Sequence, residues 1–526
     1  MLGSDAVVIG LAFHVPAARR AAVRRALDTA STRRERLQAL YVDTADGALA
    51  RARLALMLRR EGVRWVQALE RRGDGVAAKY EHEVTLVRAP RHVDASAIDP
   101  ARHAASEAGR RLERALRGAG PLAEMFRTDV QRLSRRVARD GALIEIAFDE
   151  GMLRAASGCA RLCELEFELL SGPAAALPAL AARWMRRHCL WWDVRSQAER
   201  GRRLAQGLER VPPLKAARSS LAADIDSGTA FARMLQEALA HAQPNLAEIA
   251  DGLAGPEHLH QLRVALRRAR SVLRECGRWC GDPAEARALD LAWRAPFAQL
   301  GAWRERDVVM ELLAPRLAAA GLRLSDESGP HCARQAASAV APARRRSRSA
   351  DPASVVCSVE VQQLLMRTLA LALGGAARSA APVEPATRDA ALAPAAARLL
   401  RRVRRRTLAG LDGFADAARA VQHRVRKRLK RLRYLYEFLL PLYHGRRARR
   451  MRRRLATADA ALGTLGDLAI ATSACEENSA RDARFGEVLV RLADERAAAQ
   501  RQAERRLRAL ANAKRPWRRP SRSVKT

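Results

Sequence analysis

The chain has 526 residues and a formal net charge of +38, with 95 Lys and Arg side chains against 57 Asp and Glu. A hydrophobic content of 48% excludes a chain that is disordered throughout, and the lack of an apolar run of 18 residues predicts no transmembrane helix. Arginine dominates the positive charge, and its planar guanidinium group suits phosphate oxygens. The composition therefore favours a polyanionic partner: nucleic acid, an anionic membrane or polyphosphate.

Alternating apolar and polar residues in the first 170 positions predict a β-rich region with interspersed helices. The predicted strands cover residues 7–15, 33–42, 54–60, 63–70, 81–87, 142–148 and 162–170. A short Glu61-Gly62 connection between the third and fourth of these strands predicts a hairpin. In the last strand, Glu164, Glu166 and Glu168 share one face. A helical connector follows to about residue 208.

From about residue 224 the pattern changes to long amphipathic helices with few strand signals. The predicted helices cover residues 229–250, 257–280, 284–315, 354–374, 391–412, 415–442, 446–475 and 481–513. Two segments rich in Ala, Pro, Ser and Arg, 325–353 and 374–394, are predicted to be mobile. The basic tail at 514–526 is predicted to be disordered.

The helical half carries an internal repeat. The repeated positions are His260, Arg263, Arg267, Arg268 and Arg270, which recur 163 residues later as His423, Arg426, Lys430, Arg431 and Arg433. Each set is followed by a Leu-Gly step, Leu300-Gly301 with Glu305 and then Leu462-Gly463 with Asp467. Matching spacing over this length predicts a duplicated helical unit with pseudo-twofold symmetry.

The repeated residues form one basic stripe on each predicted helix. Positions 260, 263, 267, 270 and 274 lie within roughly 80° of one another on a helix. A solvated charged face is the ordinary interpretation of such a run, but it normally mixes both signs for pairing along the helix. Residues 401–454 instead carry 20 Arg and Lys side chains against three carboxylates. Such self-repulsion is most easily explained by a bound polyanion, whose binding should depend strongly on salt.

The two stripes resemble a known family. HQLRVALRRAR (260–270) and HRVRKRLKRLRYLYEFL (423–439) are similar to the two signature helices of the CHAD family, the conserved-histidine α-helical domain. LGAWRERDV (300–308) and LGTLGDL (462–468) resemble its Gly-Asp turns, with Glu305 where Asp is usual. The resemblance covers about 224–513. It implies two pseudosymmetric four-helix units, with inorganic polyphosphate bound by basic faces that line a cleft between them.

The N-terminal half resembles the CYTH family, on YVDTADGAL (41–49), LALMLRREGVRWVQALE (54–70), CELEFELLSG (163–172) and the connector RSQAERGRRLA (195–205). The resemblance implies an antiparallel barrel of the triphosphate tunnel metalloenzymes. In such a barrel, basic residues hold triphosphate and glutamates hold Mg²⁺ or Mn²⁺, which activates the attacking water.

This sequence departs from the tunnel pattern at its centre. Where the family has Glu-x-Glu-x-Lys on the first strand, the chain has Val8, Gly10 and Ala12, and Glu70 replaces an expected lysine. The remaining acidic residues are Glu164, Glu166 and Glu168 as a metal-ligand candidate, with Glu81, Glu83, Glu145 and Asp149 nearby by family position. The remaining phosphate-ligand candidates are Arg59, Arg127 and Arg132. A solvent-facing strand edge is the alternative for the three glutamates. We expect catalysis to be absent or weak.

These observations predict an α+β multidomain protein: an antiparallel β-barrel followed by an all-α, pseudo-twofold helical bundle. The expected domains are a barrel with its connector at 1–205, a linker at 206–223, and a helical domain at 224–513 with repeats at about 224–324 and 391–513. The expected function is binding of inorganic polyphosphate by the helical domain. The expected polyphosphate ligands are His260, Arg263, Arg267, Arg268, Arg270, Arg274, His423, Arg426, Lys427, Lys430, Arg431 and Arg433.

Two alternatives stay open. One is a metal-dependent inorganic triphosphatase, which converts triphosphate to diphosphate and phosphate in an altered tunnel. The other is non-specific nucleic-acid binding through the same charge, against which the scarcity of stacking aromatics argues. The first residues show no signal peptide, so we expect a cytoplasmic protein, with polyphosphate granules as a candidate place of association.

Overall fold

The computed structural model describes residues 6–73, 77–90, 92–322, 351–377, 391–409, 411, 413–480 and 482–517. The chain divides into two compact units that interleave in sequence. The first unit contains residues 1–214, 239–254 and 356–380, and the second contains 215–238, 255–355 and 381–526. The sequence-derived domain boundaries at 205 and 224 stay a prediction.

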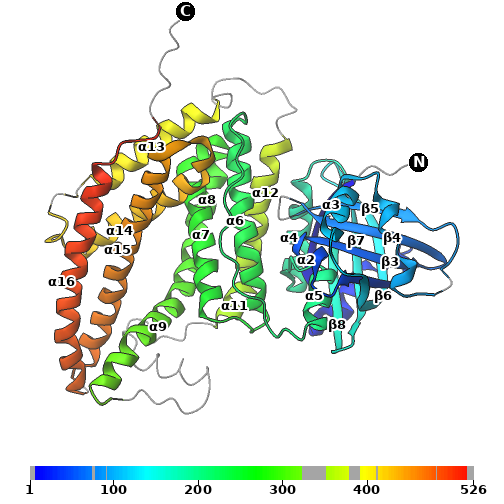
Figure 1. Ribbon diagram of the computed structural model, residues 1–526, viewed down its shortest axis with the longest axis horizontal. Helices are drawn as coiled ribbons and strands as arrows, with labels where there is room; N and C mark the ends of the chain where they lie inside the picture. Colours follow the sequence, from blue (N-terminus) through cyan, green and yellow to red (C-terminus); the bar gives the residue numbers. More distant parts are fainter. Residues whose placement is uncertain are drawn as a thin grey trace, which may run out of the picture. The chain divides into compact units, whose positions relative to one another are not determined.

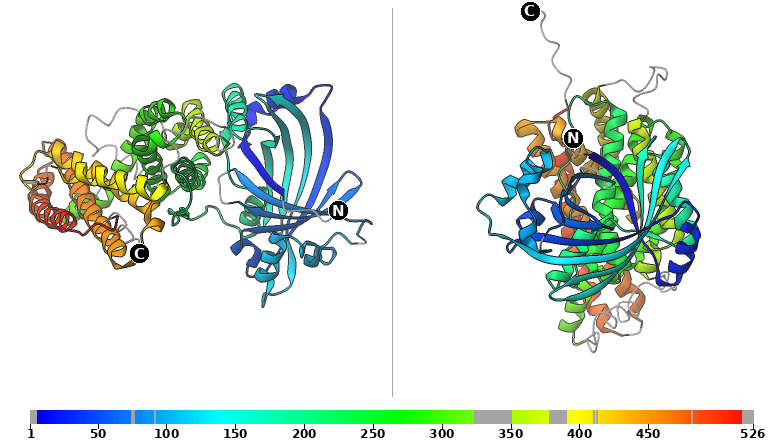
Figure 2. Two further views of the ribbon diagram at one scale, coloured as in Figure 1. Left: turned by 90° about the horizontal axis from the view of Figure 1, so that it is seen from above. Right: turned by 90° about the vertical axis from the view of Figure 1, so that its right-hand side faces the viewer.

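The first unit is built on a closed antiparallel barrel (Figures 1 and 2). Its strands are β1 (Ala6–His14), β2 (Arg33–Thr44), β3 (Leu54–Glu61), β4 (Arg64–Arg72), β5 (Ala78–Thr85), β6 (Leu122–Arg139), β7 (Ala142–Ala155) and β8 (Gly158–Ser171). The order is β5-β4-β3-β2-β6-β7-β8-β1, and a β5–β1 pairing closes the ring. The short strand β9 (Trp191–Trp192) pairs antiparallel with the last two residues of β1. The predicted barrel is confirmed.

Two apolar clusters lie on opposite faces of the same strands, one on the outer surface of the barrel and one in its lumen. On the outside, Leu40, Leu56 and Leu69 pack with residues from α2 (Ala48–Arg51) and α3 (Glu107–Leu116). On the inside, Tyr41, Phe126 and neighbouring side chains pack with Ala198 and Leu204 of α5 (Gln197–Ala205). Because strand side chains alternate between faces, the inner cluster fills part of the lumen with apolar atoms.

A segment from late in the chain completes the first unit. Helix α4 (Ala176–His188) packs against α12 (Val359–Ala377). The side chain of Gln362 is fully buried, and its Oε1 accepts a hydrogen bond from the backbone N–H of Trp192 at 2.9 Å. A buried amide group must be satisfied in this way. The first unit therefore depends on residues more than 150 positions from its barrel.

The second unit is helical (Figure 1). Its elements are the first half of α6 (Ser227–Ala250), α7 (Pro256–Cys276), α8 (Pro283–Ala292), α9 (Arg294–Ala319), α13 (Leu392–Leu408), α14 (Arg419–Phe438), α15 (Gly445–Asn478) and α16 (Arg484–Ala511), with α11 (Pro352–Val356) at the division between the units. The predicted helix at 284–315 is interrupted at Trp293, which is buried. Pro296 lies in the first turn of α9, where a missing N–H costs no helical hydrogen bond.

The two segments predicted to be mobile lie largely outside the described residues. The prediction for the tail was wrong in its boundary, because Trp517 is 2% exposed and its ring lies 5.8 Å from that of Tyr436 and 6.2 Å from that of Tyr443. The buried ring of Trp517 packs the start of the tail against the rest of the second unit. The basic composition of the tail gave no indication of this contact. Among the described helices, none is long and apolar enough to cross a membrane.

Candidate functional site

Strand register directs the acidic face of β8 into the barrel. Glu164, Glu166 and Glu168 lie opposite His14, Ala12 and Gly10 of β1, and β8 is hydrogen-bonded on its other side to β7. Glu164 is only 1% exposed. The three glutamates therefore line the lumen, and the alternative of a solvent-facing strand edge is wrong. The same register places Val8 opposite Lys79 of β5, so the first strand contributes no carboxylate to the lumen.

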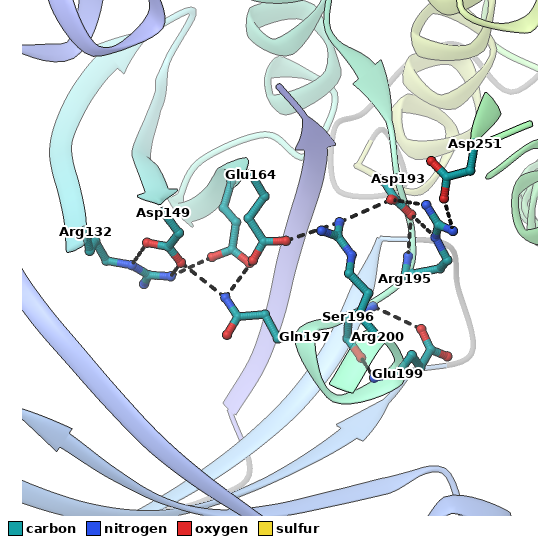
Figure 3. Close-up of polar contacts among 11 residues, drawn as sticks. Arg132, Asp149, Glu164, Asp193, Arg195, Ser196, Gln197, Glu199, Arg200 and Asp251 are labelled. Carbon is teal, nitrogen blue, oxygen red and sulfur yellow. Dashed lines mark hydrogen bonds and ion pairs between the residues drawn. The ribbon is translucent and has the colours of Figure 1, made fainter. Parts of the chain in front are cut away.

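Each carboxylate at the centre of the lumen is held by a nitrogen donor (Figure 3). Arg132 donates two hydrogen bonds to Asp149, at 2.7 and 2.6 Å, and a third to Glu166 at 3.0 Å. The Gln197 amide donates to Glu164 at 2.6 Å and to Asp149 at 3.2 Å. Because Gln197 belongs to α5, this helix takes part in the polar centre of the lumen as well as in its apolar side.

Helix α5 is fixed where it enters the barrel (Figure 3). Its first turn carries a capping box between Ser196 and Glu199, which satisfies backbone N–H groups at the start of the helix. Arg200 joins Glu164, at 3.3 Å, to the buried carboxylate of Asp193, at 3.1 Å. Arg195 also pairs with Asp193, at 2.7 Å. The helix is therefore tied to the barrel by ion pairs that are shielded from water.

A second charged group occupies another part of the lumen. Arg59 pairs with Glu61 at 2.7 Å, with Glu81 at 3.6 Å, and with Glu83. Lys79 lies 3.5 Å from Glu81. Burial raises the pKa of Glu70, which faces the same lumen. The candidate phosphate ligand Arg59 is thus already neutralised by carboxylates.

The third arginine candidate lies on the other face of the barrel. Arg127 is the register partner of Leu40, which belongs to the outer cluster. Its guanidinium group pairs with Glu124 at 2.7 Å. Arg127 and Arg132 are five positions apart on β6 with an unbroken register between them, so the alternation of side chains along a strand places them on opposite faces. Arg127 is therefore not a lumen ligand.

These residues do not fit a divalent metal ion. Mg²⁺ and Mn²⁺ require several carboxylate or carbonyl oxygens that converge on one point. Here Asp149, Glu164 and Glu166 direct their oxygens at Arg132, Arg200 and Gln197 instead. Among the described residues, no group of three His, Cys, Asp or Glu side chains has a metal-binding arrangement. The described residues of this barrel therefore provide no set of oxygens that could hold a metal ion for catalysis.

The basic stripes of α7 and α14 meet where these helices pack together. Arg267 donates a hydrogen bond to the Tyr434 hydroxyl at 3.4 Å. Burial lowers the pKa of His260, and the nearby cations Arg304, Arg267 and Lys430 lower it further. Burial alone would raise the pKa of Tyr434, but Arg267, Lys430 and Arg433 lower it. We call His260, Arg267, Arg304, Lys430 and Tyr434 the basic centre.

Comparison with protein families identifies a known domain in each half of the chain. A model of the CYTH domain matches residues 13–189, and a model of the CHAD domain matches residues 233–476. The chain contains a CYTH domain followed by a CHAD domain. Both family resemblances predicted from the sequence are confirmed.

Solved structures similar to the chain cover its two parts separately. A CHAD domain from Ricinus communis is 25% identical, covers 58% of this chain and 98% of its own, and has a TM-score of 0.43. A putative adenylyl cyclase from Hippeastrum, described as having a dominant triphosphatase activity, is 18% identical and covers 39% of this chain and 98% of its own, with a TM-score of 0.28. A putative adenylate cyclase from Bacillus halodurans is 14% identical, with 34% and 89% covered and a TM-score of 0.24.

The stripes of the CHAD helices are otherwise paired with acidic residues of the same or neighbouring helices, and these pairs include Lys430 of the basic centre. Arg270 and Arg274 pair with Asp290, Lys430 and Arg433 with Asp459, Arg268 and Arg433 with Glu437, Arg426 with Asp467, and Arg431 with Glu275. Arg268 is 4% exposed and lies over the Phe438 ring. It therefore contributes to helix packing and is not accessible to a ligand. His423 and Lys427 are exposed at the surface of α14.

The first arginine of each stripe packs closely against a glycine. The two glycines do not occupy equivalent positions in the two repeats. A methyl group on Gly301 would lie 2.6 Å from Arg263 Nη1, and one on Gly466 would lie 2.6 Å from Arg426 Nη1. Gly463, the counterpart predicted from the Leu-Gly step, has open space beside it. The two repeats of the CHAD domain therefore use different glycines for the same close approach.

Four residues of these sites were not predicted. Arg304 and Tyr434 lie within the motifs that carry the CHAD resemblance, and Gln197 and Arg200 lie within the connector that carries the CYTH resemblance. Each motif marked the right segment. The identity of the contacting residue depends on helix packing, which the motif alone does not encode.

The buried Glu164 should make the stability of the CYTH barrel depend on pH. Burial, with Glu166 and Asp149 nearby, raises the pKa of Glu164 to about 7 despite Arg200 and Gln197. The folded state then binds the proton more tightly than the unfolded state, so the free energy of unfolding falls as pH rises from about 4.5 to 7, by on the order of 3 kcal/mol. Urea unfolding from pH 5 to 8 should show this fall in the wild type and a smaller one in E164Q. Equal slopes would contradict the assignment.

Proposed function

We propose that the CHAD helices bind inorganic polyphosphate and that the CYTH barrel is a structural module without triphosphatase activity. The observation that carries the first half is the basic centre, where cations from α7, α9 and α14 approach one another. Lys430 also pairs with Asp459 and Arg304 with Glu311, so Arg267 is the cation of the centre that the described contacts leave for a ligand. Within the described residues, Arg267 forms no ion pair with a carboxylate; its partner is the neutral Tyr434. Cations held together in this way repel one another, and a polyanion relieves that repulsion.

A chain of phosphates fits this surface better than a nucleic acid does. The basic centre offers guanidinium, ammonium and imidazole donors, all of which bind phosphate oxygens. Reading of unpaired bases requires exposed aromatic rings, whereas Tyr434 is 1% exposed. The surface therefore offers contacts to phosphate without a platform for bases.

The second half of the proposal rests on the lumen of the CYTH barrel. Triphosphate is strongly anionic, and the cations Arg59, Lys79 and Arg132 that would hold it are already paired with carboxylates. Part of the remaining space is filled by Tyr41 and Phe126 packed on α5. Release of orthophosphate from tripolyphosphate in Mg²⁺ or Mn²⁺, with loss of that activity in E166Q, would contradict this half.

Titration of the full chain with polyphosphate at several salt concentrations tests the first half. Double-stranded DNA at the same phosphate concentration serves as competitor. We expect tight binding, a linear fall of log K with log salt, and little displacement by DNA. Equal displacement by DNA would reduce the stripes to general electrostatic attraction and would favour the nucleic-acid alternative.

A further inference from the structure

A cavity lies at the C-terminal end of the α7 stripe, outside the basic centre. It has a volume of about 380 Å³ and lies between the end of α7, the 277–283 turn, α8 and the start of α9. Arg274, Arg278, Arg287 and Arg294 line it, together with a single carboxylate, that of Asp290. Its size is in the range of small-molecule sites, and its lining carries four positive charges against one negative.

The carboxylate of Asp290 fixes the orientation of two arginine side chains at the cavity. Asp290 is 5% exposed and accepts hydrogen bonds from Arg270 at 3.1 Å and from Arg274 at 2.9 Å. Both of its oxygens are therefore used by arginines of the α7 stripe. A ligand in the cavity would meet the remaining donors of Arg274, and the orientation of that side chain is already fixed. Preorganised donors of this kind lower the cost of binding.

Three of the four arginines are available to a ligand. Arg278, Arg287 and Arg294 are exposed, and none forms an ion pair or side-chain hydrogen bond with the described residues. They come from three different elements, the 277–279 turn, α8 and α9. Three unpaired guanidinium groups around one cavity repel one another and suit a compact ligand with several negative charges.

The cavity continues the α7 stripe. The guanidinium carbons of Arg263, Arg267 and Arg270 lie 4.7, 5.4 and 5.5 Å from the centre of the Phe297 ring, which holds the three cations together. Arg270 then shares Asp290 with Arg274 at the cavity wall. From position 260 to position 274 the stripe is about 21 Å long, at 1.5 Å per residue. A linear polyanion on this stripe therefore reaches the cavity at one end.

We propose that this cavity binds the terminal phosphoryl group of a polyphosphate chain, an inference that rests on the proposed function. Phosphate monoesters lose a second proton at a pKa of about 6, and a terminal phosphate resembles them. An internal phosphate carries one charge, so the end of the chain carries the additional charge that a cluster of unpaired arginines selects. Free orthophosphate has the same chemistry and is the other source of such a group.

The test compares chain ends with chain interiors, using R287Q/R294Q. The probes are tripolyphosphate, tripolyphosphate methylated at both ends, long-chain polyphosphate and orthophosphate. We expect the double variant to bind tripolyphosphate at least about tenfold more weakly, since two charge-assisted contacts are lost. Binding of the methylated probe should change little between wild type and variant. The loss for the long chain should be smaller than that for tripolyphosphate, because the interior contacts remain.

A matched control carries the same loss of charge elsewhere. Arg505 and Arg506 are exposed on α16 and have no partner among the described residues, so R505Q/R506Q should affect all probes slightly and equally. An equal loss for methylated and unmethylated probes in R287Q/R294Q, or no loss at all, would overturn the end-binding proposal. Binding of orthophosphate as tight as that of tripolyphosphate would overturn it in favour of a free-phosphate site.

The outcomes separate this proposal from the proposed function. If the long chain binds no more tightly per molecule than tripolyphosphate and R287Q/R294Q abolishes the binding of both, polyphosphate binding by the stripes fails while the cavity remains a phosphoryl site. If the long chain binds tightly and R287Q/R294Q changes nothing, the proposed function stands and the end-binding proposal fails. Failure to bind either probe contradicts both. Thermal unfolding of each variant shows whether the fold is retained.

Discussion

R267Q/K430Q should bind long-chain polyphosphate about 100-fold more weakly than the wild type at low salt. The two side chains approach each other at the basic centre, and each charge-assisted contact with phosphate contributes roughly a factor of ten. Removal of two cations should also reduce the slope of log K against log salt by about 1 to 2. Isothermal titration at three salt concentrations measures both quantities.

R505Q/R506Q is the control for this result too, because it removes the same charge from a face outside the stripes. It should leave the affinity within about threefold of the wild-type value, since distant exposed charges are screened by salt. Unchanged affinity and slope in R267Q/K430Q would show that the basic centre is not the binding surface. Equal losses in both variants would mean that only the net charge matters.

G201A should destabilise the CYTH barrel by about 1–3 kcal/mol or more, the range for overpacking of a core. A methyl group on Gly201 would lie 2.2 to 2.3 Å from three atoms of the buried Phe126 ring, too close for any side-chain carbon. Either the ring or α5 must move, and α5 also carries the Gln197 and Arg200 contacts to Glu164. Urea unfolding at neutral pH measures the loss.

G120A is the matched control in the same unit. Gly120 is exposed and has no atom within 4 Å of the place of a new methyl group, so the substitution should change stability by less than about 0.5 kcal/mol. A free energy of unfolding for G201A equal to that of G120A would show that α5 does not pack on Phe126 as described.

The strand and helix pattern of this chain could largely be predicted, because alternation and helical periodicity are local properties of a sequence. Strand β6 was the exception: 18 residues long, it is interrupted by charged residues such as Arg132 and Arg136. These face a lumen that is itself charged, so the usual apolar face is missing. A strand that lines a polar lumen does not show the alternation of a strand beside an apolar core.

The candidate sites were predicted less completely, since they depend on which side chains face each other. The two stripes are repeated in the sequence, and the structure brings Arg267 and Lys430 into one basic centre. The pairing of Arg268 with Glu437 requires knowledge of how α7 packs on α14. In the barrel, one glutamate row was correctly recognised as a unit, but the contacts of Glu164 with α5 and of Glu166 with Arg132 are tertiary contacts that strand patterns do not contain.

The dependence of the first unit on α12 has a consequence for synthesis on the ribosome. Chains emerge from the N-terminus, and N-terminal domains generally fold first. Gln362 accepts a hydrogen bond from the backbone N–H of Trp192, and Gln363 donates one to the backbone carbonyl of Ala182. Both glutamines are synthesised long after the barrel strands. Helix α4 therefore lacks its contact with α12 while the intervening helices are translated. During that interval the face of α4 that α12 later covers stays open to solvent and to other proteins.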